Sequence, residues 1–181
     1  RTFVMYIAFQ APLEIKDKDT DIPPAQRGRS YSHRFTVAGG AQPVTWRLLP
    51  GSVLPKGLAF NAASGELRGT PTETGQFRFS IEVTDVLKTV AARELVLGVF
   101  EPVSVQLPVP VGGAAGADFR VELRLDNGHP PVVWKLTGGS LPPGLQLDEK
   151  TGLISGRPSA PGTFSFRVQA TDALGLIGTA Q

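Results

Sequence analysis

Three aspartates alternate with other residues in the segment Asp17–Asp21, which reads D-K-D-T-D. Calcium is bound by several carboxylate and carbonyl oxygens that converge on one ion, so Asp17, Asp19 and Asp21 are candidate ligands. Against a calcium loop, lysines interleave with the aspartates and the glycine of an EF-hand loop is absent. We therefore interpret the segment as a solvated loop between strands, and calcium binding is the alternative.

Two further aspartates, Asp85 and Asp172, stand at matching positions 87 residues apart, each directly after a threonine. Each follows a stretch of alternating apolar residues, where the chain is expected to turn into another strand. A carboxylate in such a place can accept hydrogen bonds from backbone N–H groups and so fix the turn. We prefer this turn role to a role as calcium ligands.

Neither of the two histidines, His33 and His129, has the partners that a metal site or a catalytic base requires. The sequence motifs of serine hydrolases, zinc proteases and P-loop proteins are also absent. The glycine-rich stretch 112–116 precedes no predicted helix, so it offers no anion-binding helix terminus and serves as a flexible lead into a strand. We therefore predict no catalytic residue, no cofactor and no enzymatic activity, with both histidines structural or exposed to solvent.

Trp46 and Trp134 could stack on a sugar ring or a nucleobase if they were exposed. Each lies in a short alternating stretch, on the same face as its apolar neighbours, so we predict that both anchor a core between two sheets. Three arginines, Arg27, Arg29 and Arg34, could form a small basic patch for acidic glycans. They have no counterparts later in the chain, and we interpret them as solvated.

These residues lie in a module that occurs twice. The line L-P-K-G-L at Leu54–Leu58 returns as L-P-P-G-L at Leu141–Leu145. The same spacing of 87 relates a longer set of pairs: Gly65 and Gly152, Gly69 and Gly156, Pro71 and Pro158, Gly75 and Gly162, Phe77 and Phe164, Phe79 and Phe166, Thr84 and Thr171. Upstream the spacing is 88, as for the two tryptophans, so a one-residue length change falls in an exposed loop.

Composition agrees with two small domains of about 90 residues each, which the length of 181 residues accommodates. The 21 glycines and 16 prolines stand mostly at repeating positions, which indicates turns and not disorder. A net charge of only +2 without a dense basic stripe argues against nucleic acid as a partner. The absence of cysteine excludes disulfides and thiolate metal sites. No membrane span is visible, since the apolar run Thr2–Phe9 is too short.

Alternation of apolar and polar residues indicates strands throughout. In Gln76–Thr84, two phenylalanines, an isoleucine and a valine point one way and polar residues point the other, as in a half-buried antiparallel strand. Leu58–Phe60 and Glu66–Leu67 flank a glycine-containing loop and predict a hairpin. About seven short strands per module, with turn signals every 8–12 residues, are typical of an immunoglobulin-like sandwich.

The string from Leu141 to Phe166, L-P-P-G-L-Q-L-D-E-K-T-G-L-I-S-G-R-P-S-A-P-G-T-F-S-F, resembles the bacterial putative Ig (He_PIG) family, a relative of cadherin-like domains. The resemblance covers nearly the whole chain, twice. It implies an all-β fold of tandem immunoglobulin-like (cadherin-like) antiparallel β-sandwiches. It also implies a bacterial cell-surface or secreted location, with the periplasm as the alternative, and no catalytic residues.

The expected organisation is a first module over residues 11–100 and a second over residues 101–181 that lacks its final strand. Residues 1–10 are interpreted as the last strand of a preceding module or as an N-terminal extension. This interpretation rests on the likeness of Arg1–Ile15 to Arg93–Val105, both an apolar run followed by phenylalanine, proline and an alternating stretch. The short joint Val99–Pro102 favours two sandwiches in series as a stiff spacer.

The predicted function is a non-enzymatic structural or adhesive segment, acting as a rigid spacer or a protein–protein interaction module. Its partners would be other modules of the same protein, surface proteins or glycans. One alternative is a glycan- or protein-binding accessory module of a secreted enzyme, for which Tyr6 and Tyr31 are the remaining aromatic candidates. Another is a subunit of an extracellular filament, in which Arg1–Phe9 supplies a strand to the second sandwich of a neighbouring copy.

Overall fold

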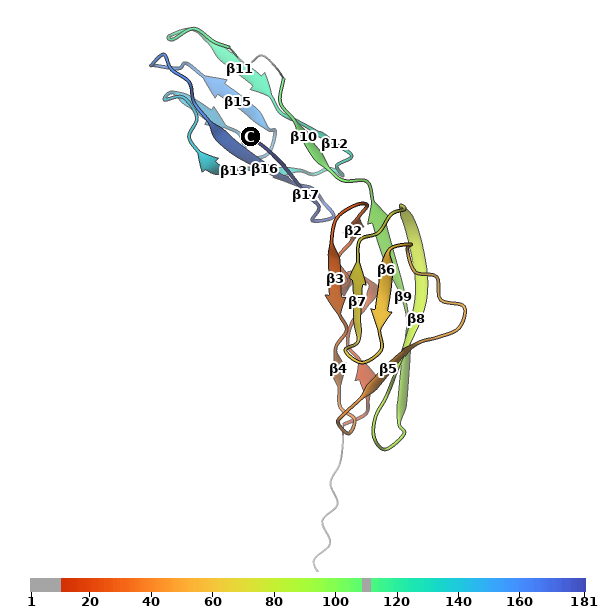
Figure 1. The fold of residues 1–181 in the computed structure, drawn as a ribbon. Helices are drawn as coiled ribbons and strands as arrows, with labels where there is room; N and C mark the ends of the chain where they lie inside the picture. The colour runs from red at the N-terminus through yellow and green to blue at the C-terminus, as the bar shows by residue number, and fades with distance from the viewer. Residues whose placement is uncertain (1–10, 109–111) are drawn as a thin grey trace, which may run out of the picture. The chain divides into compact units, whose positions relative to one another are not determined.

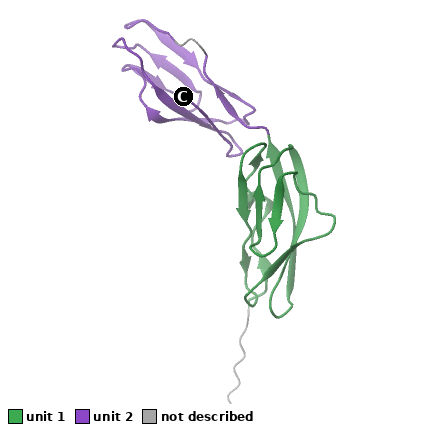
Figure 2. Cartoon of the chain, in the orientation of Figure 1, with its two compact units in different colours: residues 1–100 green, residues 101–181 purple. Residues whose placement is uncertain are grey.

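The computed structural model describes residues 11–108 and 112–181, and the chain divides into two compact units, residues 1–100 and residues 101–181 (Figure 2). We refer to them as unit 1 and unit 2. The described residues contain no α-helix, and their regular elements are β-strands apart from one short 3-10 turn, η1 (Asp19–Asp21). Residues 1–10, interpreted above as a strand of a preceding module, lie outside the described residues.

Unit 1 is a sandwich of two main sheets (Figure 1). One sheet has the strand order β2-β9-β8-β5 and the other has the order β3-β7-β6, while β1 pairs with β4 at one side. The strands are β1 (Glu14–Ile15), β2 (Ala25–Gln26), β3 (Tyr31–Arg34), β4 (Val37–Ala38), β5 (Thr45–Leu48), β6 (Leu58–Asn61), β7 (Glu66–Gly69), β8 (Gly75–Thr84) and β9 (Val90–Phe100).

All strand pairs of unit 1 are antiparallel except one, in which β2 runs parallel to the end of β9. The first strand of the sandwich is broken, because η1 and the prolines Pro23 and Pro24 separate β1 from β2. Proline has no N–H to donate to a ladder, so the chain leaves one sheet and joins the other at this point. Sequence alternation alone does not reveal this change of sheet.

Unit 2 repeats the arrangement of unit 1. One sheet has the order β13-β16-β17, the second has the order β11-β15-β14, and β10 pairs with β12. The strands are β10 (Ser104–Gln106), β11 (Phe119–Glu122), β12 (Arg124–Asp126), β13 (Val133–Gly139), β14 (Leu145–Leu147), β15 (Leu153–Gly156), β16 (Phe166–Thr171) and β17 (Ile177–Ala180). The predicted fold class, tandem immunoglobulin-like sandwiches, is therefore confirmed.

The core of unit 1 lies between its two sheets. Phe79 of β8 and Leu67 of β7 come from opposite sheets and are both fully buried. The ring of Phe35 packs against both Phe79 and Trp46, and its centroid lies 6.1 Å from that of Phe79 and 6.3 Å from that of Trp46. Fully burying such a side chain contributes about 1.5–3 kcal/mol, so the alternation read from the sequence accounts for the main stabilising term. Unit 2 has a smaller set of buried residues around Trp134 and Val168.

The end of unit 2 differs from the expectation that its final strand is lacking. The first four residues of that strand form β17, which pairs with β16 from Val168–Ala180 to Thr171–Ile177. In unit 1 the equivalent strand β9 pairs with β8 over ten residues, from Thr84–Val90 to Gly75–Val99. Unit 2 therefore has the beginning of the strand, and β17 covers only part of β16.

Candidate functional site

The carboxylate of Asp85 joins two turns at one end of unit 1. Its Oδ1 accepts a hydrogen bond from the backbone N–H of Thr89 at 2.8 Å, and its Oδ2 accepts one from Ala41 at 3.0 Å. The hydrogen bond from Ala41 is the largest influence on the pKa of Asp85 and, with the others, outweighs burial and holds that pKa below its usual value. The turn role predicted for this aspartate is confirmed.

Asp172 has the same role in unit 2. Its Oδ1 accepts from the N–H groups of Leu174 at 2.9 Å and Leu176 at 2.8 Å, and its Oδ2 accepts from the N–H of His129 at 3.1 Å. The imidazole Nδ1 of His129 also lies 3.1 Å from Oδ2. Burial would raise the pKa of Asp172, but the hydrogen bonds outweigh it and the pKa is lowered. His129 therefore contacts Asp172 through both its backbone N–H and its ring, whereas the equivalent residue of unit 1, Ala41, contacts Asp85 through its backbone N–H.

Asp17 is not part of a solvated loop, so this part of the interpretation is wrong. The residue is 7% exposed, and its Oδ2 accepts hydrogen bonds from the backbone N–H of Thr36 at 2.6 Å and from the Thr36 hydroxyl at 2.9 Å. Its Oδ1 lies 2.9 Å from Nε2 of His33. Burial would raise the pKa of Asp17, but the hydrogen bonds from Thr36 and His33 outweigh it and lower the pKa. Asp17 therefore fastens β1 to the strand that contains His33.

The other two aspartates of this run are used separately. Asp19 accepts a hydrogen bond from the N–H of Val96 in β9 at 2.9 Å, and Asp21 accepts one from the N–H of Lys18 at 2.9 Å. Within residues 11–108 and 112–181, no three His, Cys, Asp or Glu side chains come together in a way that could hold a metal ion. Among the described residues, the five aspartates considered as calcium ligands are therefore not gathered into one group: Asp17, Asp19, Asp21, Asp85 and Asp172.

The aromatic candidates for ligand stacking are mostly buried. Trp46 is 7% exposed and Trp134 is 4% exposed, which confirms both as core anchors. Tyr31 is half-buried and donates its hydroxyl to the carbonyl of Pro23 at 3.0 Å, and burial raises the pKa of its phenol. Tyr6 lies outside the described residues. Stacking on a sugar ring therefore has little support in either unit.

The remaining predicted candidates lie on loops and strand surfaces. The side chains of Arg27, Arg29 and Arg34 are exposed. In the glycine-rich stretch, Gly116 donates its N–H to the carbonyl of Pro158 at 2.7 Å, as Gly28 does to Pro71 at 2.8 Å in unit 1. The two loops are thus equivalent, and no helix follows Gly116 in the described part of unit 2.

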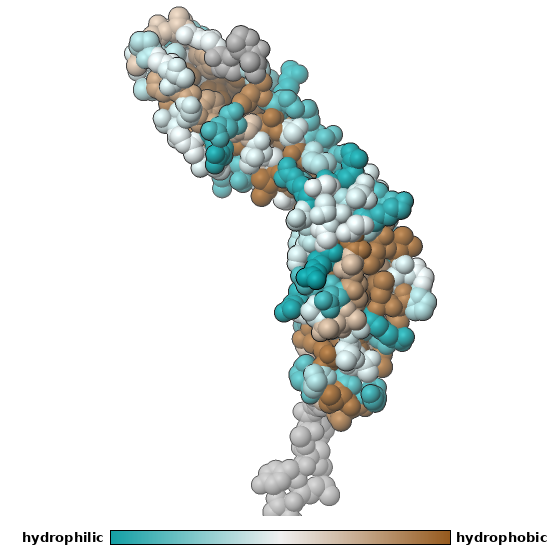
Figure 3. Space-filling view, viewed as in Figure 1, coloured by the Kyte–Doolittle hydropathy of each residue, from teal (hydrophilic) through white to brown (hydrophobic). Residues whose placement is uncertain are grey.

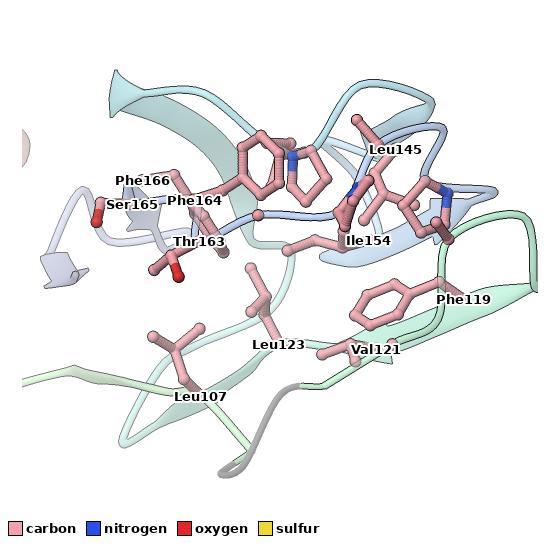
Figure 4. A pocket seen from close by; sticks show the side chains of 18 of the residues that line it. Leu107, Phe119, Val121, Leu123, Leu145, Ile154, Thr163, Phe164, Ser165 and Phe166 are labelled. Atoms are coloured by element: carbon pink, nitrogen blue, oxygen red, sulfur yellow. The ribbon is translucent and has the colours of Figure 1, made fainter.

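Unit 2 contains an apolar groove with a volume of about 520 Å³. Its walls come from strand β11, from the hairpin β14–β15 and from the segment that leads into β16 (Figure 4). The apolar lining includes Leu107, Phe119, Val121, Leu123, Leu145, Ile154, Phe164 and Phe166. Figure 3 shows apolar residues gathered around a hollow in this unit. We refer to this site as the unit 2 groove.

The sequence did not reveal the unit 2 groove, because every apolar residue in it has the pattern of an ordinary core residue. A signal was available in the repeat itself. Aligning the two modules at a spacing of 87 places Gln181 opposite Glu94, so the residues opposite Leu95, Leu97 and Val99 are not among those of the sequence. These three are buried in unit 1, so the expectation that the second module lacks its final strand already indicated this region, although not the groove itself.

The two sandwiches define the class of the protein as a tandem array of immunoglobulin-like modules. The model of the family described as "Putative Ig domain" (He_PIG) matches residues 15–99 and again residues 101–180. The chain belongs to this family, with one match in each unit. In the described ranges, no helix has the length and apolar character needed to cross a bilayer.

Among curated relatives, the "Serine-rich adhesin for platelets" of Staphylococcus aureus is 29% identical over 128 residues, which cover 67% of this chain and 5% of the adhesin. The same adhesin from strain MRSA252 is 28% identical over 128 residues, which cover 9% of its length. The chain thus spans less than a tenth of the length of these relatives.

Solved structures with a similar fold include the N-terminal eight Ig domains of the Down syndrome cell adhesion molecule. The match has a TM-score of 0.49 and 14% identity, and covers 93% of this chain and 26% of that one. A 282-residue C-terminal fragment of intimin, solved with an intimin-binding domain of its receptor, matches with a TM-score of 0.48 and 14% identity. It covers 96% of this chain and 63% of the fragment.

Proposed function

We propose that this chain is a non-enzymatic structural and adhesive segment of a bacterial cell-surface or secreted protein. In this role the two modules act as a spacer or as a protein–protein interaction module within a longer array. The observation that carries the proposal is that the aspartates found in both modules stabilise turns. Asp85 and Asp172 accept hydrogen bonds from backbone N–H groups of turns. In the described residues, no second reactive side chain beside these carboxylates occurs in both modules.

The family and its relatives support the same proposal. Membership in an Ig-like family supports a role in contact or spacing, because in such folds function resides in surfaces and loops on a stable sandwich. The curated relatives are named as adhesins, and this chain resembles a small part of them. The glycan-binding alternative is less well supported, because Trp46 and Trp134 are buried and the hydroxyl of Tyr31 donates a hydrogen bond to the carbonyl of Pro23.

Antibody labelling of intact cells that produce the protein tests this proposal. Antibodies raised against the purified chain should label unpermeabilised cells or the culture medium, and their Fab fragments should reduce attachment of the cells to a protein-coated surface. Fab fragments against an unrelated surface protein are the matched control. Labelling that appears only after permeabilisation would contradict the proposed location. Surface labelling without any effect of the Fab fragments on attachment would favour the spacer role over direct adhesion.

A further inference from the structure

The turn that follows β12 in unit 2 contains the only Asn-Gly pair of the sequence, Asn127 and Gly128. Asn127 has a φ of +58°, in the left-handed region. After glycine, asparagine is among the residues that adopt this conformation most readily. At the spacing of 88 its equivalent in unit 1 is Gly39, which has a φ of +65°. The turn therefore requires left-handed backbone in both units, and unit 2 places a side-chain amide there.

The backbone nitrogen next to this amide is that of Gly128. In unit 1 the equivalent N–H, that of Gly40, donates a hydrogen bond to the carbonyl of Ala11 at 3.0 Å. Among the described residues, no acceptor lies within hydrogen-bond distance of the N–H of Gly128. Because glycine has no Cβ, no side chain of its own crowds the approach to this nitrogen. The nitrogen of Gly128 is therefore available to the side chain of the residue before it.

The two asparagines of the chain are held in different ways. Asn127 is exposed, and its Nδ2 donates a hydrogen bond to the carbonyl of Pro102 at 3.1 Å. A single exposed hydrogen bond of this kind is readily exchanged for one to water. Asn61 instead accepts two hydrogen bonds at its Oδ1, from the N–H groups of Ala63 at 2.9 Å and Ser64 at 3.2 Å. The side chain of Asn127 is therefore the less constrained of the two.

We propose that Asn127 is a site of spontaneous deamidation, with water as the only co-reactant. The backbone nitrogen of Gly128 loses its proton to a solvent base and attacks Cγ of Asn127, so that an N–Cγ bond forms. The Cγ–Nδ2 bond breaks, and Nδ2 takes up a proton and leaves as ammonia. A water molecule then opens the cyclic succinimide at either of its carbonyl carbons. The product is aspartate or isoaspartate at position 127, and each carries one new negative charge.

The modification weakens the contacts around this turn. A carboxylate has no proton to donate, so the hydrogen bond to the carbonyl of Pro102 is lost and a negative charge faces that carbonyl instead. Isoaspartate also lengthens the backbone by a carbon atom between two fixed points. On one side Asp126 is in register with β10, and on the other the N–H of His129 donates to the carboxylate of Asp172. We therefore expect the modified unit 2 to unfold more easily.

The inference goes beyond the proposed function, since it depends only on the geometry of the turn and on water. It distinguishes the two modules, because unit 1 has Gly39 and Gly40 at the equivalent positions and so has no amide to lose there. Unit 2 would thus acquire a charge and lose stability as the protein ages, while the same turn of unit 1 stays unchanged.

Peptide mapping of the incubated chain tests the site. Trypsin releases residues 125–135 and residues 57–68, so mass spectrometry follows both asparagines in one digest. Deamidation should be at least about tenfold faster at Asn127 than at Asn61, because two backbone hydrogen bonds hold the latter. It should also be faster at mildly alkaline pH than at neutral pH, because the attacking nitrogen must lose its proton. Equal rates at the two asparagines, or an unmodified Asn127, would overturn the proposal.

The same measurement on the chain unfolded in guanidinium chloride separates the turn geometry from the dipeptide chemistry. In the folded chain Asn127 should react within about threefold of its rate in the unfolded chain, because its attack requires no wider opening of the sandwich. Asn61 should react at least about tenfold more slowly in the folded chain than in the unfolded one. Protection of Asn127 as strong as that of Asn61 would show that the turn prevents the attack, and would overturn the proposal.

Ageing of two matched chains tests the consequence for unit 2. Trp134 reports its unfolding in a Trp46→Phe background, with and without Asn127→Gly, which copies the glycine of unit 1 and should fold. Incubation until most of Asn127 is modified should raise the equilibrium constant for unfolding about three- to tenfold, as expected for one lost hydrogen bond. The aged Asn127→Gly chain should match its fresh sample. An equal change in both chains, or no change in either, would overturn the inferred effect of the modification on unit 2.

Discussion

The indole of Trp46 lies directly on the backbone of Gly65, so closely that a Cβ on this glycine would be 2.5 Å from Cε2 of the ring. Gly65 has a φ of +64°, which places it in the left-handed region. Trp134 and Gly152 repeat the contact in unit 2, with the corresponding distance of 2.7 Å. The tryptophan and the glycine of the hairpin loop therefore recur together because each requires the other.

Substituting alanine for Gly65 should destabilise unit 1 by about 2–4 kcal/mol. Part of this comes from the left-handed backbone, where a Cβ costs about 1 kcal/mol, and the rest comes from displacement of the Trp46 ring. Urea unfolding followed by the fluorescence of Trp46, in a Trp134→Phe background, measures the effect on unit 1 alone. The chain has two tryptophans, one in each unit, so the background variant leaves a single reporter.

Gly28→Ala is the matched control for this prediction. Gly28 has a similar φ of +75°, but nothing lies within 4 Å of the position that its Cβ would take. Only the backbone contribution of about 1 kcal/mol is expected there. Equal losses for Gly65→Ala and Gly28→Ala would mean that contact with the indole does not limit this position.

Replacing Asp172 by asparagine should destabilise unit 2 by about 2–4 kcal/mol. The carboxylate accepts hydrogen bonds from three backbone N–H groups, and an amide offers one acceptor oxygen while its own N–H₂ group would face a donor. Urea unfolding of unit 2, read from Trp134 in a Trp46→Phe background, gives the value. Asp118→Asn is the control, because this carboxylate is 81% exposed and pairs with Arg157 at the surface.

Acid should destabilise unit 1 through Asp17 and Asp85. Both have a pKa in the folded state below the ordinary value of 3.8, so the unfolded chain binds more protons as the pH falls. Their contribution is fully present above about pH 5 and is lost as the pH drops through the folded-state pKa values. Unfolding in urea between pH 7 and pH 3 should show this decline, and Asp17→Asn should reduce its slope. A slope that is unchanged in the variant would remove Asp17 from the account.

The sequence was sufficient to predict the strands, the repeated turns and the burial of both tryptophans, because these follow from local alternation and from the repeat. It was insufficient for Asp17, because the partners of its carboxylate are Thr36 and His33, 19 and 16 residues away. Its alternation with lysines is that of a surface loop, and only the pairing of β1 with β4 brings it inside. His33 offered a partial signal, since alternation within Tyr31–Arg34 points it the same way as Tyr31.

The contact between Asp19 and Val96 shows the same limit. It joins residues 77 positions apart, and neither residue type suggests the other. The carboxylate accepts the N–H of Val96, where β9 faces the loop that contains η1. Long-range contacts of this kind depend on which strands become neighbours, and single-sequence alternation fixes strand faces without fixing strand order.

The same substitution at equivalent positions should have unequal effects in the two units. Phe79→Ala should cost unit 1 about 3–5 kcal/mol, because Phe79 is 1% exposed, contacts Phe35 and is covered by Leu95 of β9. Phe166→Ala should cost unit 2 distinctly less, since its ring forms a wall of the unit 2 groove and is half-buried before the change. Each loss is read from the single tryptophan of its own unit. Equal losses would indicate that Phe166 is as well covered in solution as Phe79.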